Sequence, residues 1–572
     1  MPYFFNGRLW ITPAVMSAVN DSALANQNLS VGNVAAMIGQ STGGQPNTPL
    51  VFGSPAQAIA TLRSGELLQA VLKAFNPSNE TGGPSSVVAI RVNPAVQSAL
   101  TLNDGSAAPC ITLASADYGL YTNQIKVAVA AGSTQGIKLT TQLGTAIYSQ
   151  DNIYAAPLSV QYTGGQATGT MSITGTTLTL AAPTGTTIST IDLNAFPTVQ
   201  ALVDNINTNA GFTAAVLGGQ GPAPSLNGLD YLTNQDIKTA VYPIQATLQA
   251  CVNWLNSSAQ SLVVATRAGG KVPAVLAATY LTGGTDGTTT NTQWGNAFTT
   301  LQTVDVQWVT PVTSNTTVIA MADTHVQYMS TVGRKERRAI CGMALATTDA
   351  QAIAEALALN SDRTSIMHIG YYDYDLTGVL TGLQLYAPYL AAAAVSGAFS
   401  GLNPGTPLTN KSLTFRGLER NLLNPTNTDP LIAGGVLCVE ATDTGYRVVK
   451  SISTWLTNAN YDKVEQSVGW ALDFTVRNVR NALKQLKGVK NNQLVPARAV
   501  SITESVLRAL AVTEPQGPGV LAGNAASPPY LGITATTTGD VVAVQFQCSP
   551  VLPANYIAVT VFATAFTGTA SA

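Results

Sequence analysis

Strand-like apolar runs alternate with helical segments along much of the 572-residue chain, and this alternation constrains the fold more than any other feature. Residues 33–38 and 87–92 form apolar runs that predict strands. Apolar residues recur at helical spacing over 67–75, which predicts a helix between those strands. Helices and strands alternate again over 293–369. Such alternation is typical of α/β folds.

Residues 100–235 interrupt this pattern. Charged residues are sparse in this segment and Arg is absent, while Thr-Gly-rich stretches such as 168–187 alternate polar and apolar residues. The alternation predicts an antiparallel β domain with one helix near 197–209. We interpret residues 100–235 as a β-rich domain inserted into an α/β core.

The other divisions follow from the same patterns. We assign residues 29–99 and 236–404 to the α/β core, and residues 405–549 to a C-terminal α/β domain. Residues 1–28 have no clear periodicity and are interpreted as an N-terminal arm, and residues 550–572 as a C-terminal strand or arm. The predicted fold is thus a multi-domain α/β protein with an inserted antiparallel β-rich domain and extended arms. Candidate arm anchors are the apolar and aromatic residues Tyr3, Phe4, Phe5, Trp10, Ile557, Val559 and Val561.

Composition limits the partners of the chain. Only 10% of the residues are charged, against about 25% in an ordinary soluble protein. A surface with so few charges suits a subunit that identical neighbours cover, because little repulsion opposes the contact. The net charge of −2 gives no overall attraction to nucleic acid or acidic lipid. The most apolar stretch, 385–399, is shorter than a membrane span and contains Pro388.

The sequence gives little support for an enzyme. Five cysteines lie about a hundred residues apart with no C-x-x-C pair, which disfavours a zinc site or a disulfide framework. Residues 39–43 match the G-x-S-x-G motif of hydrolases, with Ser41 in the nucleophile position. The glycines and prolines that follow disfavour the helix this motif requires. We therefore expect a structural turn at Ser41, no metal and no cofactor.

Two groups of basic residues are candidates for contacts. A tight cluster comprises Arg334, Lys335, Arg337 and Arg338, and we expect it to be a solvated helix end. A second group forms one stripe on a long helix predicted over 462–487, comprising Arg477, Arg480, Lys484 and Lys487. Two interpretations of the stripe remain open: it favours solubility and the helix dipole, or it binds an acidic partner.

Several segments resemble the contractile tail sheath proteins of myovirus-type phages and related contractile injection systems. They are V-G-N-V-A-A-M-I-G-Q-S-T-G-G-Q-P-N-T-P-L-V-F-G-S (31–54), the G-G-x-x-x-x-V-V-A-I-R-V run (82–92), D-Y-G-L-Y-T-N-Q-I (117–125), L-T-G-G-T-D-G (281–287), the small-residue helix 387–399 with 413–422, and G-Y-R-V-V-K-S-I-S-T (445–454). The order of the segments across most of the chain, rather than any one motif, carries the resemblance. The 100–235 segment lies outside it.

The resemblance implies a structural polymer. Sheath subunits form stacked hexameric rings around a tail tube, and their arms add strands to neighbours' sheets, so that the polymer holds together as the tail contracts. It also implies contacts with baseplate and tail terminator proteins, assembly in the host cytoplasm and a place in the virion. The basic stripe is then a candidate tube contact, with the helix expected over 501–511 as its rival, and residues 100–235 are expected to face outward.

Two alternatives come from other classes of protein. A different self-assembling virion or surface-layer protein would share the low charge and the Thr-Gly-rich β region. A hydrolase would need Ser41 and one of the two histidines, His325 or His368, to meet in space.

Overall fold

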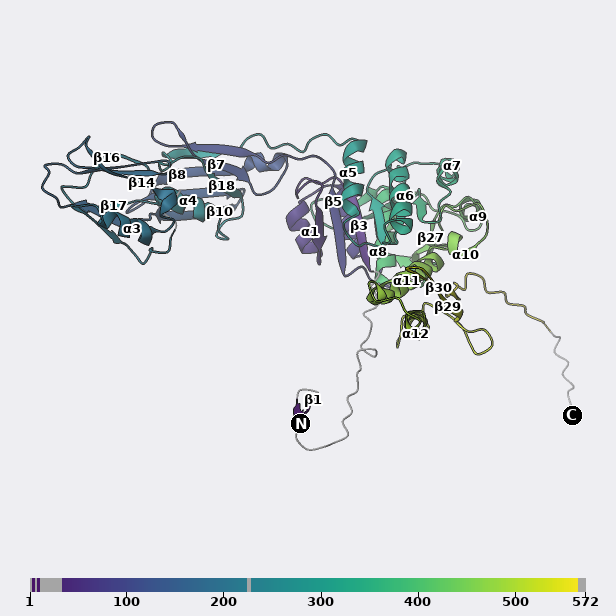
Figure 1. The fold of residues 1–572 in the computed structure, drawn as a ribbon. Coiled ribbons are helices and arrows are strands. Elements are labelled where there is room, and N and C mark those ends of the chain that lie inside the picture. The colour runs from purple at the N-terminus through teal and green to yellow at the C-terminus, as the bar shows by residue number, and fades with distance from the viewer. Residues whose placement is uncertain (1–2, 6–7, 11–32, 224–227, 564–572) are drawn as a thin grey trace, which may run out of the picture.

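A computed structural model describes residues 3–5, 8–10, 33–223 and 228–563. Its elements form a main body, a distal part that extends to one side of this body, and a C-terminal part beneath it (Figure 1). Within the described ranges, no helix is both long and apolar enough to cross a bilayer, and no cluster of three or more potential ligand side chains could hold a metal ion.

The main body is built on a six-stranded sheet in which only the last strand is antiparallel. Its order is β22 (Thr364–Met367), β21 (Arg338–Gly342), β20 (Trp308–Pro311), β3 (Val34–Gly39), β5 (Ser86–Arg91) and β4 (Pro49–Phe52). The central strands are buried along most of their length, which explains why their sequences are nearly continuous apolar runs. The predicted α/β core is confirmed here.

Helices cover both faces of this sheet. They are α1 (Pro55–Leu62), α2 (Glu66–Phe75), α5 (Asn291–Leu301), α6 (Thr316–Thr331), α7 (Asp349–Leu359) and α8 (Pro388–Gly401). α1 begins with a side-chain cap: the Ser54 side chain accepts a hydrogen bond from the backbone N–H of Gln57, and Pro55 takes the first helical position.

α8 is buried on nearly all sides. Its sequence is apolar or small all round, as a helix enclosed by protein requires. A Cβ built on Gly397 would lie 2.3 Å from the backbone oxygen of Ala74, so the glycine allows α2 and α8 to approach closely. Phe399 stacks on Trp308 with ring centroids 4.1 Å apart, and Trp470 meets Trp308 edge-on.

The main body also includes a set of short elements that follow β22 in sequence. They are β23 (Tyr371–Tyr374), β24 (Leu383–Tyr386), β25 (Ser412–Leu413), β26 (Gly417–Leu418), α9 (Thr428–Ala433), β27 (Val439–Thr442) and β28 (Gly445–Val448). Apolar side chains as far along as Val448, and Trp470 beyond it, belong to the same core as the six-stranded sheet. The main core therefore continues past residue 404, where the sequence predicted the end of the α/β core.

The distal part consists mainly of antiparallel strands. Its elements are β6 (Ala99–Asn103), β7 (Pro109–Ser115), η2 (Leu120–Gln124), β8 (Lys126–Ala131), β9 (Ile137–Leu143), β10 (Ala146–Ile153), β11 (Leu158–Tyr162), β12 (Thr170–Thr174), β13 (Thr177–Ala181), β14 (Thr187–Asp192), η3 (Leu193–Ala195), α3 (Val199–Asn207), β15 (Phe212–Val216), β16 (Leu232–Asp236), β17 (Tyr242–Ile244), α4 (Thr247–Leu255), β18 (Val263–Arg267) and β19 (Leu276–Tyr280). Two hydrophobic clusters fill it, both separate from the main core.

The distal part is longer than the expected insertion. α4 and β18, which lie in the 236–404 segment assigned to the core, pack in a distal cluster, and β19 pairs with β8. The chain returns to the main body only near Thr285. The backbone oxygen of Thr285 accepts a hydrogen bond from the N–H of Val96 at 2.8 Å. Spacing along the sequence could not reveal this return point, because it is set by pairing across nearly 190 residues.

The fully buried Arg91 ties the distal part to the main body. Its guanidinium bonds the Asp286 carboxylate at 2.9 Å and donates to the backbone oxygens of Gly44 and Tyr118. Asp286 therefore belongs to an ion pair within the chain.

The C-terminal part contains α10 (Tyr461–Val464), α11 (Gln466–Leu483), η4 (Lys484–Leu486), α12 (Leu494–Leu510), β29 (Tyr530–Thr538) and β30 (Val541–Cys548). The helix predicted over 462–487 is thus interrupted at Glu465, whose backbone is extended. The buried Glu465 carboxylate lies 3.4 Å from Lys450 Nζ, and this tertiary contact accompanies the break. β29 and β30 form a two-stranded sheet that packs on α12.

At the N-terminus, β1 (Tyr3–Phe5) and β2 (Arg8–Trp10) pair in antiparallel fashion. The side chains of the candidate anchors Tyr3, Phe4, Phe5 and Trp10 lie outside the described part of the structure.

Candidate assembly surfaces

The basic stripe on α11 is divided between the interior and the surface. Arg477 is 6% exposed; it bonds both carboxylate oxygens of Asp305, at 2.9 and 3.1 Å, and the backbone oxygen of Glu336. Arg480 pairs with the Glu336 carboxylate. The expectation that the whole stripe faces a partner is therefore wrong for Arg477, because acids distant in sequence bind it within the chain.

A second buried ion network lies one turn earlier on α11. Asp473 accepts hydrogen bonds from Arg338 at 3.0 Å and from both terminal nitrogens of Arg363, at 2.9 and 3.0 Å. Arg338 is 3% exposed and also donates to Gln466 Oε1. Burial lowers the pKa of Arg338, and the Asp473 carboxylate opposes this change. The two networks attach α11 to the ends of β21 and β22.

The tight basic cluster is also divided: Arg334 is exposed, whereas Arg337 and Arg338 are buried, which contradicts the expected solvated helix end for these two residues. Arg337 is 1% exposed and donates to His325 Nε2 at 3.0 Å. Since arginine cannot accept a hydrogen bond, His325 is neutral with its proton on Nδ1. Burial, followed by the charge of Arg337, lowers the pKa of His325 to about 3. Arg337 and Arg338 are thus interior cations of the main body.

Lys484 and Lys487, at the end of the same helix, are exposed. Lys484 and Arg480 border an apolar hollow of about 370 Å³ between α11 and β30. Its apolar lining comprises Val476, Val479, Leu483, Val542, Val544 and Phe546. Exposed cations beside an apolar hollow form a surface that can contact an acidic and partly apolar partner.

The segment after β30 is extended and exposes its apolar side chains. Val551 N–H donates to the Val520 backbone oxygen, and Asn555 bonds the Glu465 carboxylate at 2.7 Å. Beyond these contacts Ile557, Val559 and Val561 are 84%, 79% and 82% exposed. They occupy alternate positions, so an extended chain would present them on one side. Nothing in the described part of the chain covers them.

The hydrolase alternative finds no support in the geometry. Ser41 is buried, its hydroxyl donates to the Gly43 backbone oxygen at 2.8 Å, and its backbone bonds the Asn93 side chain. His325 contacts Arg337, and His368 contacts Asp349 at 2.7 Å. Neither histidine is a hydrogen-bond partner of Ser41 in the described ranges.

Sequence reasoning missed the acidic partners of these arginines. The acidic partners are Asp305, Glu336 and Asp473. Each binds an arginine that lies between 110 and 172 residues away in the sequence. No local spacing signals such pairs. The apolar positions on β30 that face the hollow could have been found, because they alternate at every second residue over 542–546.

Comparison with known proteins is consistent across the chain. No family model matches. The chain is 26% identical over 577 residues to the tail sheath protein of Bacillus phage SP01, covering 97% of this chain and 96% of that protein. It is 28% identical over 522 residues to the putative tail sheath protein of Enterococcus phage phiEF24C, covering 87% of each.

A solved structure shares the fold. The crystal structure of a sheath tail protein from Listeria innocua superposes with a TM-score of 0.55, at 11% sequence identity, over 91% of this chain and 92% of that one. The similarity thus extends through the main body, the distal part and the C-terminal part. The chain is therefore similar over almost its whole length to tail sheath proteins of phages, and it shares the fold of a sheath tail protein.

Proposed function

We propose that the protein polymerises as stacked hexameric rings around the tail tube, and that contraction of the polymer drives the tube through the host envelope. The observation that carries this proposal is the exposed apolar segment at the C-terminus, residues 551–563. An extended segment with alternating apolar side chains suits addition to the sheet edge of another copy. Each strand of the β29–β30 sheet has one edge unpaired in the described chain.

Strand exchange would link the subunits. Ile557, Val559 and Val561 would be the anchors of the C-terminal arm, and Tyr3, Phe4, Phe5 and Trp10 those of the N-terminal arm. Burying large apolar side chains stabilises such a link by about 1.5–3 kcal/mol for each fully covered residue. The globular parts could then repack during contraction while the arms stay paired.

Arm deletions test the linkage. Deleting residues 550–572, or residues 1–20, should abolish polymers while leaving a monomer with the circular dichroism spectrum of the full chain. Negative-stain electron microscopy of concentrated protein at moderate salt would show hollow tubes with sixfold end views only for the full chain. Tubes of normal length from either deletion would refute strand exchange.

The exposed end of α11 is our candidate for the tube contact. Lys484 and Lys487 remain free to meet acidic residues of a tube protein, whereas Arg477 is committed to Asp305. The double variant Lys484→Glu/Lys487→Glu should fold normally but fail to assemble on co-expressed tubes. Lys271→Glu, which changes an exposed lysine of the distal part, is the matched control and should assemble. Normal assembly of the double variant would discard this contact.

The remaining parts of the proposal follow from the proposed position of the subunit around the tail tube. Baseplate and tail terminator proteins would meet the ends of the polymer, and assembly would take place in the host cytoplasm. The distal part would face outward, because the main body and the C-terminal part carry the proposed lattice and tube contacts. The proposal includes no enzymatic step, no cofactor, no membrane insertion and no direct contact with nucleic acid.

A further inference from the structure

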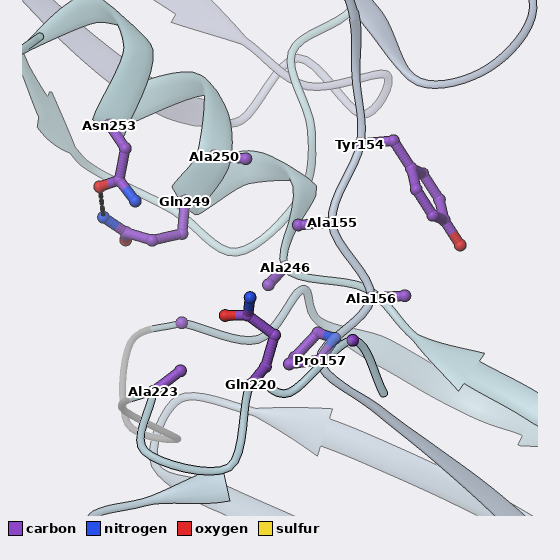
Figure 2. A pocket seen from close by; sticks show the side chains of 12 residues that line it. Tyr154, Ala155, Ala156, Pro157, Gln220, Ala223, Ala246, Gln249, Ala250 and Asn253 are labelled. Atoms are coloured by element: carbon purple, nitrogen blue, oxygen red, sulfur yellow. Dashed lines mark hydrogen bonds between the residues drawn. The ribbon is translucent and has the colours of Figure 1, made fainter. Parts of the chain in front are cut away.

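The distal part contains a cavity of about 600 Å³ that none of these assembly contacts uses (Figure 2). It lies between α4, the segment 154–157 and the described residues 218–223 that follow β15. Its lining comprises Tyr154, Ala155, Ala156, Pro157, Gly218, Gln220, Ala223, Gly228, Ala246, Gln249, Ala250 and Asn253. Cavities of this size are typical of small-ligand sites.

One face of α4 forms a wall of the cavity. Ala246, Gln249, Ala250 and Asn253 follow the spacing i, i+3, i+4, i+7, which places them on one side of the helix. The opposite side of α4 carries Leu248, Cys251, Val252 and Leu255, which are buried in the distal core. The cavity-facing side is therefore held in place by a packed scaffold.

The polar groups in the cavity are neutral and only partly satisfied. Gln249 Nε2 donates to Asn253 Oδ1 at 2.9 Å, which holds both amides in position and leaves Asn253 Nδ2 free to donate. Gln249 Oε1 lies 3.5 Å from Arg267 Nη1. Gln220 points from its loop toward α4 in Figure 2, and neither its side-chain amide nor the Tyr154 hydroxyl bonds any described residue.

The lining selects for an uncharged ligand. None of the twelve lining residues carries a charge, so a buried phosphate, carboxylate or ammonium would lack a lining partner. Each amide side chain offers both a donor and an acceptor, as does the tyrosine hydroxyl, which matches groups that also donate and accept. The alanines and Pro157 provide an apolar surface between these polar groups.

We propose that this cavity binds a neutral saccharide. The hydroxyl groups of a sugar ring would pair with Gln220, Gln249 and Asn253, and the apolar C–H face of the ring would lie against Ala155, Ala156 and Pro157. The inference rests on the cavity alone and does not depend on the proposed polymerisation.

The test uses the full chain and saturation-transfer NMR. The probes are glucose, galactose, N-acetylglucosamine and their trisaccharides, with sialylated and phosphorylated sugars as charged comparators. At least one neutral trisaccharide should bind. Gln249→Leu/Asn253→Leu should weaken that binding at least tenfold, because it removes both amides from α4.

Two further variants separate loss of the site from loss of the fold. Ala250→Trp fills the cavity from α4 and should also abolish binding. Gln150→Ala removes an exposed amide elsewhere in the distal part and should bind like the natural chain. Thermal melting followed by circular dichroism identifies any variant that unfolds. Binding of none of the neutral sugars, preference for the charged ones, or equal binding by folded Ala250→Trp would each overturn the proposal.

Discussion

At the scale of single residues, Asp473 is the anion of one of the two ion networks that attach α11 to the main body. It serves Arg338 and Arg363 together, and Arg338 is almost completely enclosed. Asp473→Asn would leave a buried guanidinium without its charge partner, and we expect it to lower the free energy of unfolding by roughly 3–5 kcal/mol. Urea unfolding followed by tryptophan fluorescence measures this change.

The matched control is Glu504→Gln on α12, which breaks the solvent-exposed pair with Arg508. Its unfolding midpoint should stay within error of the natural chain, since exposed pairs contribute little. An Asp473→Asn midpoint equally unchanged would show that the network does not hold α11.

A second prediction at the scale of single residues is that His325 makes the free energy of unfolding depend on pH. Its pKa is lowered to about 3 in the fold, against an ordinary value of about 6.5 in the unfolded chain. Its stabilising contribution is therefore complete above about pH 6.5 and is lost as the pH falls toward 3, because the unfolded chain binds the proton first. The loss can reach about 1.4 kcal/mol for each pH unit.

His325→Gln keeps an acceptor for Arg337 but does not titrate. Between pH 6 and pH 4 its free energy of unfolding should fall less steeply than that of the natural chain, in urea unfolding at concentrations where light scattering shows monomers. Parallel slopes for the two proteins would contradict a neutral, buried His325.

At the scale of elements, the close contact between α2 and α8 depends on small residues. A Cβ on Gly397 would overlap the backbone of Ala74, which cannot move as a side chain could. Gly397→Ala should therefore destabilise the protein by about 1–3 kcal/mol despite the higher helix propensity of alanine. Gly295→Ala on α5 is the control: no atom lies within 4 Å of its added Cβ, so it should stabilise by about 0.5–1 kcal/mol. Equal thermal midpoints for both variants would contradict the packing argument.

At the scale of the whole molecule, the distal part leaves and rejoins the main body at adjacent points. Val96 and Thr285 pair across the junction, and the main core shares no cluster with the distal cores. Replacing residues 98–283 by Asn-Gly, a common hairpin turn, should leave a main body that folds and unfolds cooperatively. Limited proteolysis and circular dichroism would check this, and an insoluble or protease-sensitive product would contradict the independence of the two parts.

The sequence by itself determined the type of most elements and the general order of the parts. Strands such as β3, expected over 33–38, and helices such as α2, expected over 67–75, depend on the periodicity of apolar residues that are neighbours in the sequence. The apolar residues near the C-terminus likewise predicted a strand or arm. The N-terminal anchors and the proposed tube contact at Lys484 and Lys487 remain predictions.

Only the tertiary structure decided where the distal part ends, which arginines are interior and where the cavity lies. α4 and β18 belong to the distal part because strands far apart in sequence pair there, and Arg477 is buried because Asp305 meets it from another element. Residues from three separate segments of the described chain line the cavity. Such features depend on contacts between residues distant in the chain, and a basic stripe has the same sequence whether it faces an internal carboxylate or a partner.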